Sequence, residues 1–312
     1  MLKNHNHPLV SVVIPTRNRP KLLVRAIESV LTQTFSNIQC IVVDDASTDN
    51  TTETVLAVDD SRILYLRNEV RVKAAASRNR GIKAAKGQYI ALLDDDDEWI
   101  PDKIEKQVIK FGRVPKQVGV IYSGFCFCSG SEPRIVRNIW PANKGNTYKE
   151  IIMSNFVGSP TPLIKRECFK TAGMFDERLP SCQDWDLWIR LAKDHEFDFV
   201  DEILAKHFVH GDQISNDLKA KIKARRILLS KYEKEFKKRP FVIGRHLKRL
   251  GQLYFLDGKF HRGRNKLFDS LFKNPLQPDI YHHLILSFFP TVYTKVLHKY
   301  YLTKIENISL YS

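Results

Sequence analysis

Cysteine is scarce in this sequence of 312 residues, and no CxxC pair occurs. The five cysteines are odd in number and scattered, at Cys40, Cys126, Cys128, Cys168 and Cys182. This spacing predicts neither a zinc site nor a disulfide framework. We therefore expect reduced, buried thiols, as is usual in a cytosolic protein.

Long apolar runs are missing as well. The N-terminus is polar and lacks the apolar core of a signal peptide. The longest apolar run near the C-terminus, Leu284–Phe289, is far too short to span a bilayer. We expect a cytoplasmic protein that contacts a membrane, if at all, peripherally at its inner face.

Acidic residues are outnumbered: 35 Asp and Glu oppose 50 Lys and Arg, and the formal net charge is +15. This surplus suits an anionic partner, such as phosphates, an acidic polymer or an anionic membrane face. Much of the surplus falls in residues 216–273. We do not expect a nucleic-acid partner, because the basic segment lacks interleaved aromatic residues and no known nucleic-acid motif occurs.

The stretch Gly87–Trp99 joins a predicted strand to a run of four aspartates. Tyr89–Leu93 are apolar or β-prone, which is typical of a strand buried on both faces of a parallel sheet. Carboxylates crowded at the end of such a strand repel one another unless a cation neutralises them. Because ligands of open α/β sheets bind at the carboxyl ends of the strands, the stretch indicates a divalent-cation site facing a phosphate-bearing ligand. The alternative is an acidic first turn of the helix predicted from Pro101.

Strands and helices alternate through the first two thirds of the chain. Strands are predicted at Leu9–Pro15, Ile38–Val43, Arg62–Leu66 and Tyr89–Leu93, and helices at Lys21–Leu31, Ser47–Val58 and Ala74–Lys86. The order predicts an α/β fold: a doubly wound, mostly parallel sheet with helices on both faces. Further elements are expected at Pro101–Phe111, Val118–Cys128, Leu163–Ile164, Glu167–Ala172 and Phe197–Phe208, with a hairpin within residues 129–150.

The character of the sequence changes after Ser215, where a basic, mainly helical extension begins. Leu218–Phe236 is predicted to be one long basic helix that ends before Pro240. We therefore divide the chain into an α/β domain, residues 1–215, and a C-terminal extension, residues 216–312.

Two carboxylates open a predicted helix at Gln183-Asp184-Trp185-Asp186. Aspartate caps helix N-termini routinely, but a cap needs only one carboxylate. From the residues alone, a general base and a helix cap both remain open for Asp184.

Five motifs, in matching order and spacing, resemble those of family 2 glycosyltransferases. They are Val10–Asn18, Val42–Asp49, Ser77-Arg78-Asn79-x-Gly81-Ile82, Asp94–Asp97 and Gln183–Trp188. The resemblance covers residues 8–215. It implies a GT-A fold, a nucleotide-sugar donor (usually a UDP-sugar), a divalent cation (Mn²⁺ or Mg²⁺) and inversion at the anomeric carbon.

On this resemblance, the nucleotide pocket would be built from the ends of the first two strands. Pro15, Thr16 and Asn18 would line it. Asp45 would accept a hydrogen bond from the base, and Asp44 would support that loop.

The resemblance also implies roles around the diphosphate. Arg78 would lie near the phosphates, which a guanidinium can bind bidentately. Asp94-x-Asp96 would be the DxD motif, with Asp96 as the direct metal ligand and Asp95 at the ribose or behind the ligands. His210 matches a family position near the metal and diphosphate, although an ordinary loop histidine is the alternative.

Asp184 would be the general base, but the sequence departs from the family next to it. The family usually has Glu before this Asp, where this chain has Gln183. The implied general base, Asp184, is kept. The contacts that the family's Glu makes with the acceptor are in doubt for this chain. This departure keeps open a non-catalytic nucleotide-sugar-binding protein on the same fold.

Two motifs that the sequence lacks exclude other classes of enzyme, and the resemblance indicates the acceptor. The loop Thr16-Arg17-Asn18-Arg19 has no Gly, which argues against a nucleotidyltransferase. No Gln-x-x-Arg-Trp motif occurs, which argues against a processive membrane synthase. We expect a glycan or lipid-linked glycan acceptor, as in bacterial surface-polysaccharide assembly. The extension would either cap the catalytic domain or attach peripherally to an anionic membrane.

Overall fold

The structure is a computed structural model that describes residues 9–129, 134–209 and 217–306, with side chains to residue 299. The chain divides into two compact units. The first contains the residues up to Glu177 together with Asp184–Phe208, and the second contains Arg178–Gln183 and the residues after Phe208. We describe each unit by itself.

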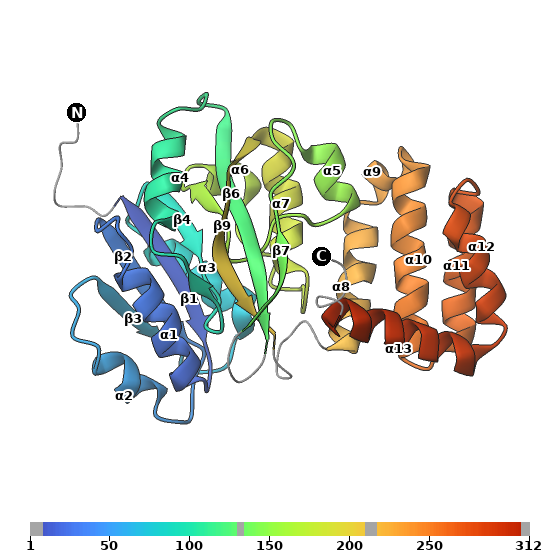
Figure 1. Cartoon of the computed structure of the whole chain (residues 1–312), viewed down its shortest axis with the longest axis horizontal. Helices are drawn as coiled ribbons and strands as arrows, with labels where there is room; N and C mark the ends of the chain where they lie inside the picture. Colours follow the sequence, from blue (N-terminus) through green and yellow to red (C-terminus); the bar gives the residue numbers. More distant parts are fainter. Residues whose placement is uncertain (1–8, 130–133, 210–216, 307–312) are drawn as a thin grey trace. The chain divides into compact units, whose positions relative to one another are not determined.

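The first unit opens with a parallel sheet (Figure 1). Its elements are β1 Val10–Thr16, α1 Pro20–Leu31, β2 Ile38–Asp44, α2 Thr51–Leu56, β3 Ile63–Arg67, α3 Lys73–Ala84 and β4 Tyr89–Leu92. The strands lie in the order β3-β2-β1-β4, and each neighbouring pair is parallel. All seven predicted elements are present. Six have small shifts of their ends, whereas the helix predicted from Ser47 to Val58 is only six residues long, Thr51–Leu56.

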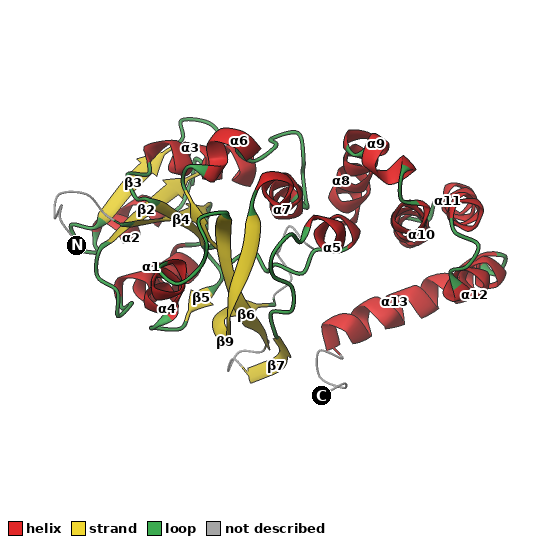
Figure 2. Cartoon of the chain, turned by 90° about the horizontal axis from the view of Figure 1, so that it is seen from above, coloured by secondary structure: helices red, strands yellow, loops and turns green. Residues whose placement is uncertain are grey.

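Helices cover both faces of this sheet because β1 is apolar on both of its sides. Val12 and Ile14 belong to the core cluster that contains Leu23 of α1. The side chain of Val13, one residue out of step, faces α3 at Gly81. Figure 2 shows α1 on one side of the strands and α3 on the other. This alternation confirms the predicted helices on both faces.

The rest of the sheet is mixed. The following elements are β5 Glu98–Trp99, α4 Lys103–Phe111, β6 Val118–Ser129, β7 Arg134–Ile139, α5 Tyr148–Met153, β8 Leu163–Lys165, α6 Cys168–Ala172, α7 Gln183–Asp194 and β9 Glu196–Phe208. β8 runs antiparallel between β4 and β6, while β6 and β9 are parallel. The full order is β3-β2-β1-β4-β8-β6-β9-β5, with β7 beside β6. The hairpin predicted within residues 129–150 is correct only for its second strand, β7, because β7 pairs with β6, which ends at Ser129.

The second unit is helical among its described residues. Its helices are α8 Leu218–Lys231, α9 Glu233–Lys237, α10 Pro240–Leu256, α11 Phe260–Lys273, α12 Pro278–Ser287 and α13 Pro290–Glu306. The predicted single helix Leu218–Phe236 is wrong in one respect: it is divided at Tyr232, whose buried ring packs against Phe236. In the part of the chain that the structure describes, no helix is both long and apolar enough to cross a membrane.

The cysteines behave largely as expected. Cys40, Cys126, Cys128 and Cys168 are buried free thiols, whereas Cys182 is half-buried. The expectation of burial is thus confirmed for four of the five.

One lysine of the first unit is completely buried. Lys103 of α4 donates to Gln107 Oε1 at 2.8 Å, and its Nζ lies 4.1 Å from the centre of the Trp99 ring. Burial lowers the pKa of Lys103 well below its usual range. The charged form therefore opposes folding.

We predict that Lys103→Met raises the free energy of unfolding at pH 7 by ~1 kcal/mol or more. The folded state binds the Lys103 proton more weakly than the unfolded state, so wild-type stability rises with pH between the lowered pKa and ~10.4. Chemical denaturation at pH 7 and pH 10 checks this, and the advantage of the variant should shrink at pH 10. The control is Lys106→Met on the same helix, where Lys106 is paired with Asp102 and Glu202 at the surface. A less stable Lys103→Met variant would contradict the prediction.

Candidate active site

Three parallel strands end at the same edge of the sheet. Thr16 of β1 lies opposite Asp44 of β2, and Val13 of β1 lies opposite Leu92 of β4. The loops that follow β1, β2 and β4 therefore meet at this edge, where open α/β sheets bind ligands. These loops carry most of the site residues that the sequence predicts.

Asn18 joins the first two of these loops. Its backbone N–H donates to Ser47 Oγ at 2.9 Å, and its Oδ1 accepts from the Thr48 N–H at 2.8 Å. Pro15, one residue before the end of β1, lies opposite Val43. The structure thus brings together the predicted pocket residues of both strands.

Asp44 is fully buried beneath the β2 loop. It accepts from Tyr65 Oη at 2.7 Å and from the Ser47 N–H at 2.8 Å. These contacts agree with the supporting role implied for Asp44.

Asp45 holds the loop that leads into α3. One carboxylate oxygen accepts from the Val72 N–H at 2.7 Å and from Asn68 Nδ2 at 3.1 Å. The other oxygen accepts from the Lys73 N–H at 2.8 Å. Contact between Asp45 and the nucleobase of a donor stays a prediction.

Backbone strain is concentrated in the same loops. Asn18, Ala46 and Lys73 have φ values of 53°, 58° and 73°, in the left-handed region that costs most non-glycine residues energy. Lys73 is the first residue of α3. Its hydrogen bond to Asp45 helps to hold this conformation.

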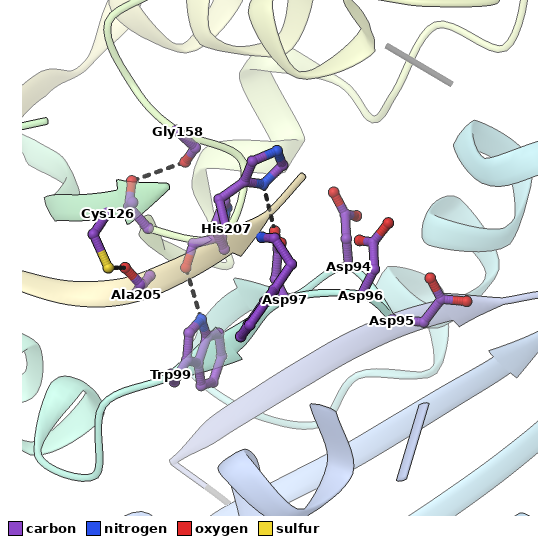
Figure 3. Close-up of polar contacts among 12 residues, drawn as sticks. Asp94, Asp95, Asp96, Asp97, Trp99, Cys126, Gly158, Ala205 and His207 are labelled. Carbon is purple, nitrogen blue, oxygen red and sulfur yellow. Dashed lines mark hydrogen bonds and ion pairs between the residues drawn. The ribbon is translucent and has the colours of Figure 1, made fainter. Parts of the chain in front are cut away.

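The four aspartates after β4 take different directions (Figure 3). Asp95 accepts from Thr16 Oγ1 at 2.8 Å and pairs with Arg19 at 3.2 Å. Asp94, Asp96 and Asp97 instead offer carboxylate oxygens that all lie within 4.8 Å of one another. Their oxygen donors fit a hard divalent cation. Asp97 is a member that the sequence analysis did not assign.

The alternative of an acidic first helical turn is wrong. β5 follows Asp97 directly, and α4 begins only at Lys103. The aspartates are held instead by a turn in which the Asp97 N–H donates to the Asp94 carbonyl at 3.1 Å.

Cations from the chain already lie among these carboxylates. Arg19 Nη1 is 3.1 Å from Asp96 Oδ2, and Arg78 pairs with Asp94. His207 Nδ1, from the end of β9, lies 3.0 Å from Asp97 Oδ2. The sequence did not predict Arg19 or His207 as site residues. Each is identified by its pairing with an aspartate that is distant in sequence, and sequence spacing does not indicate such a pairing.

The electrostatics reflect a crowded acidic site. Burial and the neighbouring Asp96 raise the pKa of Asp95 to about 6, with Arg19 opposing the shift. Burial raises the pKa of Asp97 to about 6, although His207 opposes it. Burial alone would lower the pKa of His207, but Asp97 raises it to about 9. The unneutralised negative charge is costly, which favours cation binding here.

Arg78 lies between the acidic cluster and α7. Its pairing with Asp94 raises its pKa despite burial, and Asp184 adds to this effect. Its guanidinium lies 5.4 Å from the centre of the Phe175 ring. The structure therefore brings together Arg78, Asp94 and Asp184, three predicted residues that are distant in sequence.

Asp184 is half-buried at the start of α7. Its Oδ2 accepts from Asn155 Nδ2 at 3.0 Å. Burial raises the pKa of Asp184, while its hydrogen bond with the Trp185 backbone and the charge of Arg78 oppose the shift. Trp185 anchors the helix through Nε1, which donates to the Ile151 carbonyl at 2.6 Å.

Asp186 has a different environment from Asp184. It is fully buried and accepts from Arg190 Nε at 2.9 Å. Arg190 in turn donates to the carbonyls of Ala172 and Met174. Asp186 therefore serves the packing of α7.

His210, which was predicted near the metal and diphosphate, lies outside the described residues and stays a prediction.

Close packing beneath Arg78 explains Gly81 of the same motif. A Cβ at Gly81 would lie 2.4 Å from Val13 Cγ1. We predict that Gly81→Ala lowers the free energy of unfolding by ~1–3 kcal/mol, because α3 must move off the sheet. Thermal and chemical denaturation measure the change. Gly112→Ala is the control: its φ is −69° and its nearest contact is 3.3 Å, so a loss as large there would contradict the packing argument.

The sequence and the fold of the chain resemble those of known glycosyltransferases. The model of "Glycosyl transferase family 2" matches residues 11–167. The Escherichia coli "Putative colanic acid biosynthesis glycosyl transferase WcaA" is 34% identical over 66% of this chain and 75% of its own length. An "Uncharacterized glycosyltransferase" of Rickettsia felis is 34% identical over 68% of this chain, and the match spans 36% of that protein's length.

A relative with a more specific name is the E. coli "UDP-Glc:alpha-D-GlcNAc-diphosphoundecaprenol beta-1,3-glucosyltransferase WfgD", which is 30% identical over 67% of this chain and 80% of its own length. Among solved structures, S. aureus TarS 1-349 in complex with UDP-GlcNAc superposes with a TM-score of 0.69 at 17% identity, over 94% of this chain and 91% of that one. The mannosyltransferase PcManGT from Pyrobaculum calidifontis, in complex with GDP-Man and Mn²⁺, has a TM-score of 0.56 at 15% identity over 97% and 88%.

The mixed sheet and the structural matches define a GT-A-like fold. The chain belongs to glycosyl transferase family 2. The predicted family, fold and enzyme class are thereby confirmed.

Proposed function

We propose that this glycosyltransferase moves a sugar from a UDP-sugar to a hydroxyl of a glycan or lipid-linked glycan, with inversion in a single displacement. The observation that carries the proposal is the meeting of Asp184, Arg78 and the Asp94–Asp97 cluster at one edge of the sheet. The name of WfgD and the UDP-GlcNAc bound to TarS support a UDP-sugar as the donor. The name of WfgD also supports a lipid-linked acceptor.

Three groups of residues divide the work. The β1 and β2 loops, with Pro15, Thr16, Asn18 and Asp45, bind the nucleotide. Arg78 stabilises charge on the leaving diphosphate. Asp184 takes the proton of the acceptor hydroxyl, and Asn155 orients its carboxylate.

A divalent cation, Mn²⁺ or Mg²⁺, fits the acidic cluster. Asp96 would hold it together with Asp94 and Asp97, and His210 is proposed nearby on the family resemblance. When bound, the cation supplies positive charge that stabilises the departing diphosphate. Arg19, which contacts both Asp95 and Asp96, keeps the cluster ordered and partly neutralised.

The proposal is tested by incubating the purified chain with a panel of nucleotide sugars, with Mn²⁺, Mg²⁺ or EDTA. We expect release of UDP from a UDP-sugar with either cation and none with EDTA. Binding of a nucleotide sugar without release under any condition, acceptor extracts included, would favour the non-catalytic alternative that Gln183 keeps open. Absence of both binding and release would overturn the proposal.

We further propose a cytoplasmic location with peripheral attachment to the inner face of the cell membrane. A lipid-linked acceptor would be presented there, and the net charge of +15 favours an anionic surface.

A further inference from the structure

Large apolar side chains are exposed where α12 turns into α13. We call this the corner surface. It consists of Ile285, Phe288, Phe289, Val292 and Val296, whose exposed fractions are 65%, 58%, 61%, 52% and 44%. An apolar cluster of this kind on a basic protein marks an interaction site.

The corner surface is not an unfilled part of the core. On α13, Tyr293 and Leu297 are buried in the cluster that also contains Leu284 of α12. Val292 and Val296, spaced four residues apart, lie on another face of α13 and remain exposed. The two helices are therefore packed internally and still present an apolar surface.

The sequence that forms the corner surface carries charge of one sign. Residues 280–305 contain no Asp or Glu. Lys295 and Lys299 are exposed on α13, the latter three residues after Val296. The Arg264 guanidinium lies 4.7 Å from the centre of the Phe288 ring. The apolar side chains are thus bordered by cations.

We infer that the corner surface inserts into the headgroup region of an anionic lipid bilayer. Apolar side chains bordered by Lys and Arg suit this depth, where acyl chains meet phosphate groups. A second copy of the chain fits less well, because a two-fold contact through this surface brings like charges such as Lys295 and Lys299 together.

This inference relocates the attachment that the sequence suggested. Part of the basic segment from α8 to α10 is engaged internally: Arg225 contacts His246, and Lys248 pairs with Asp279. The corner surface lies elsewhere and contains five exposed large apolar side chains, whereas the described residues of α8 to α10 expose one, Phe241. The inference deepens the proposed function and rests on it for its biological meaning, but its test requires no donor.

The test is co-sedimentation of the full chain with vesicles of phosphatidylcholine, alone or mixed with phosphatidylglycerol. We expect binding to the mixed vesicles only, weakened by salt. Ile285→Ser with Phe289→Ser should lower the partition coefficient by ~10-fold or more. Serine is favourable at Phe289, which directly precedes α13, so this change does not oppose folding there. Lys295→Gln with Lys299→Gln should also cost ~10-fold or more.

Two control variants separate the corner surface from other exposed residues. Phe272→Ser with Leu276→Ser removes two even more exposed apolar groups, at the end of α11 and in the loop before α12. Lys223→Gln with Arg226→Gln removes two exposed charges of α8. Both should bind vesicles as the wild type does. Circular dichroism and UDP binding, measured in parallel, keep a folding defect or a failure of the transferase proposal distinguishable from a membrane effect.

Three results would overturn the inference. One is equal binding to both vesicle types or to neither. Another is an equal loss in the corner and control variants. The third is a concentration-dependent dimer in sedimentation velocity, abolished by Ile285→Ser with Phe289→Ser, together with no binding of the wild type to vesicles. That result would assign the corner surface to a second copy of the chain.

Discussion

Asp184→Asn is expected to lower the turnover number by ~10²–10⁴-fold while leaving donor affinity unchanged. Asn keeps the size of the side chain and its hydrogen-bonding to Asn155, but it cannot accept the proton of the acceptor hydroxyl. UDP release gives the turnover and calorimetry gives the affinity. Asp194→Asn, at the exposed end of the same helix, is the matched control and should be as active as the wild type.

If Asp184→Asn kept its turnover, another residue would have to be the general base. Asp186 is the other carboxylate at the start of α7, but its burial and its bond to Arg190 make it unsuited to that role. A loss of donor affinity equal to the loss of turnover would instead make Asp184 a binding residue.

The pH dependence should carry the same signature. Burial raises the pKa of Asp184, and a base works only when it is deprotonated. The wild-type rate should therefore fall as pH drops through an apparent pKa above the usual range of an aspartate, ~3.9. A profile in which the acid limb lies at the ordinary value would contradict the assigned environment.

Asp96→Asn is expected to weaken Mn²⁺-dependent UDP binding by ~10-fold or more, because it removes one of three clustered carboxylates. Calorimetric titration of UDP with and without Mn²⁺ measures the loss, and circular dichroism confirms the fold. Asp201→Asn, exposed on β9, removes the same charge outside the cluster and should bind as the wild type does. Tight Mn²⁺-dependent binding by Asp96→Asn would show that the cluster does not hold the cation.

The sequence predicts the first half of the fold well because its signals are local. The apolar run before Asp94 and the β-branched run at Leu9–Pro15 identify β4 and β1. β5 contains only two residues, so it has no pattern to detect. The division between α8 and α9 at Tyr232 has no Gly or Pro to mark it, so the sequence pattern does not reveal it.

The site follows the same division between local and distant signals. The DxD pattern selects Asp94 and Asp96, but a turn returns Asp97 to the same cluster. Arg19 and His207 reach the aspartates from 76 and 110 residues away in sequence. Such pairings depend on the folded sheet, so composition and spacing could not predict them.

The anomeric configuration of the product tests the proposed mechanism most directly. Time-resolved proton NMR of the sugar transferred from a UDP-α-sugar reports whether the new bond is β or α. A single displacement with Asp184 as base predicts the β product and none from Asp184→Asn. An α product formed by the wild type would contradict the account, since one in-line displacement cannot retain configuration.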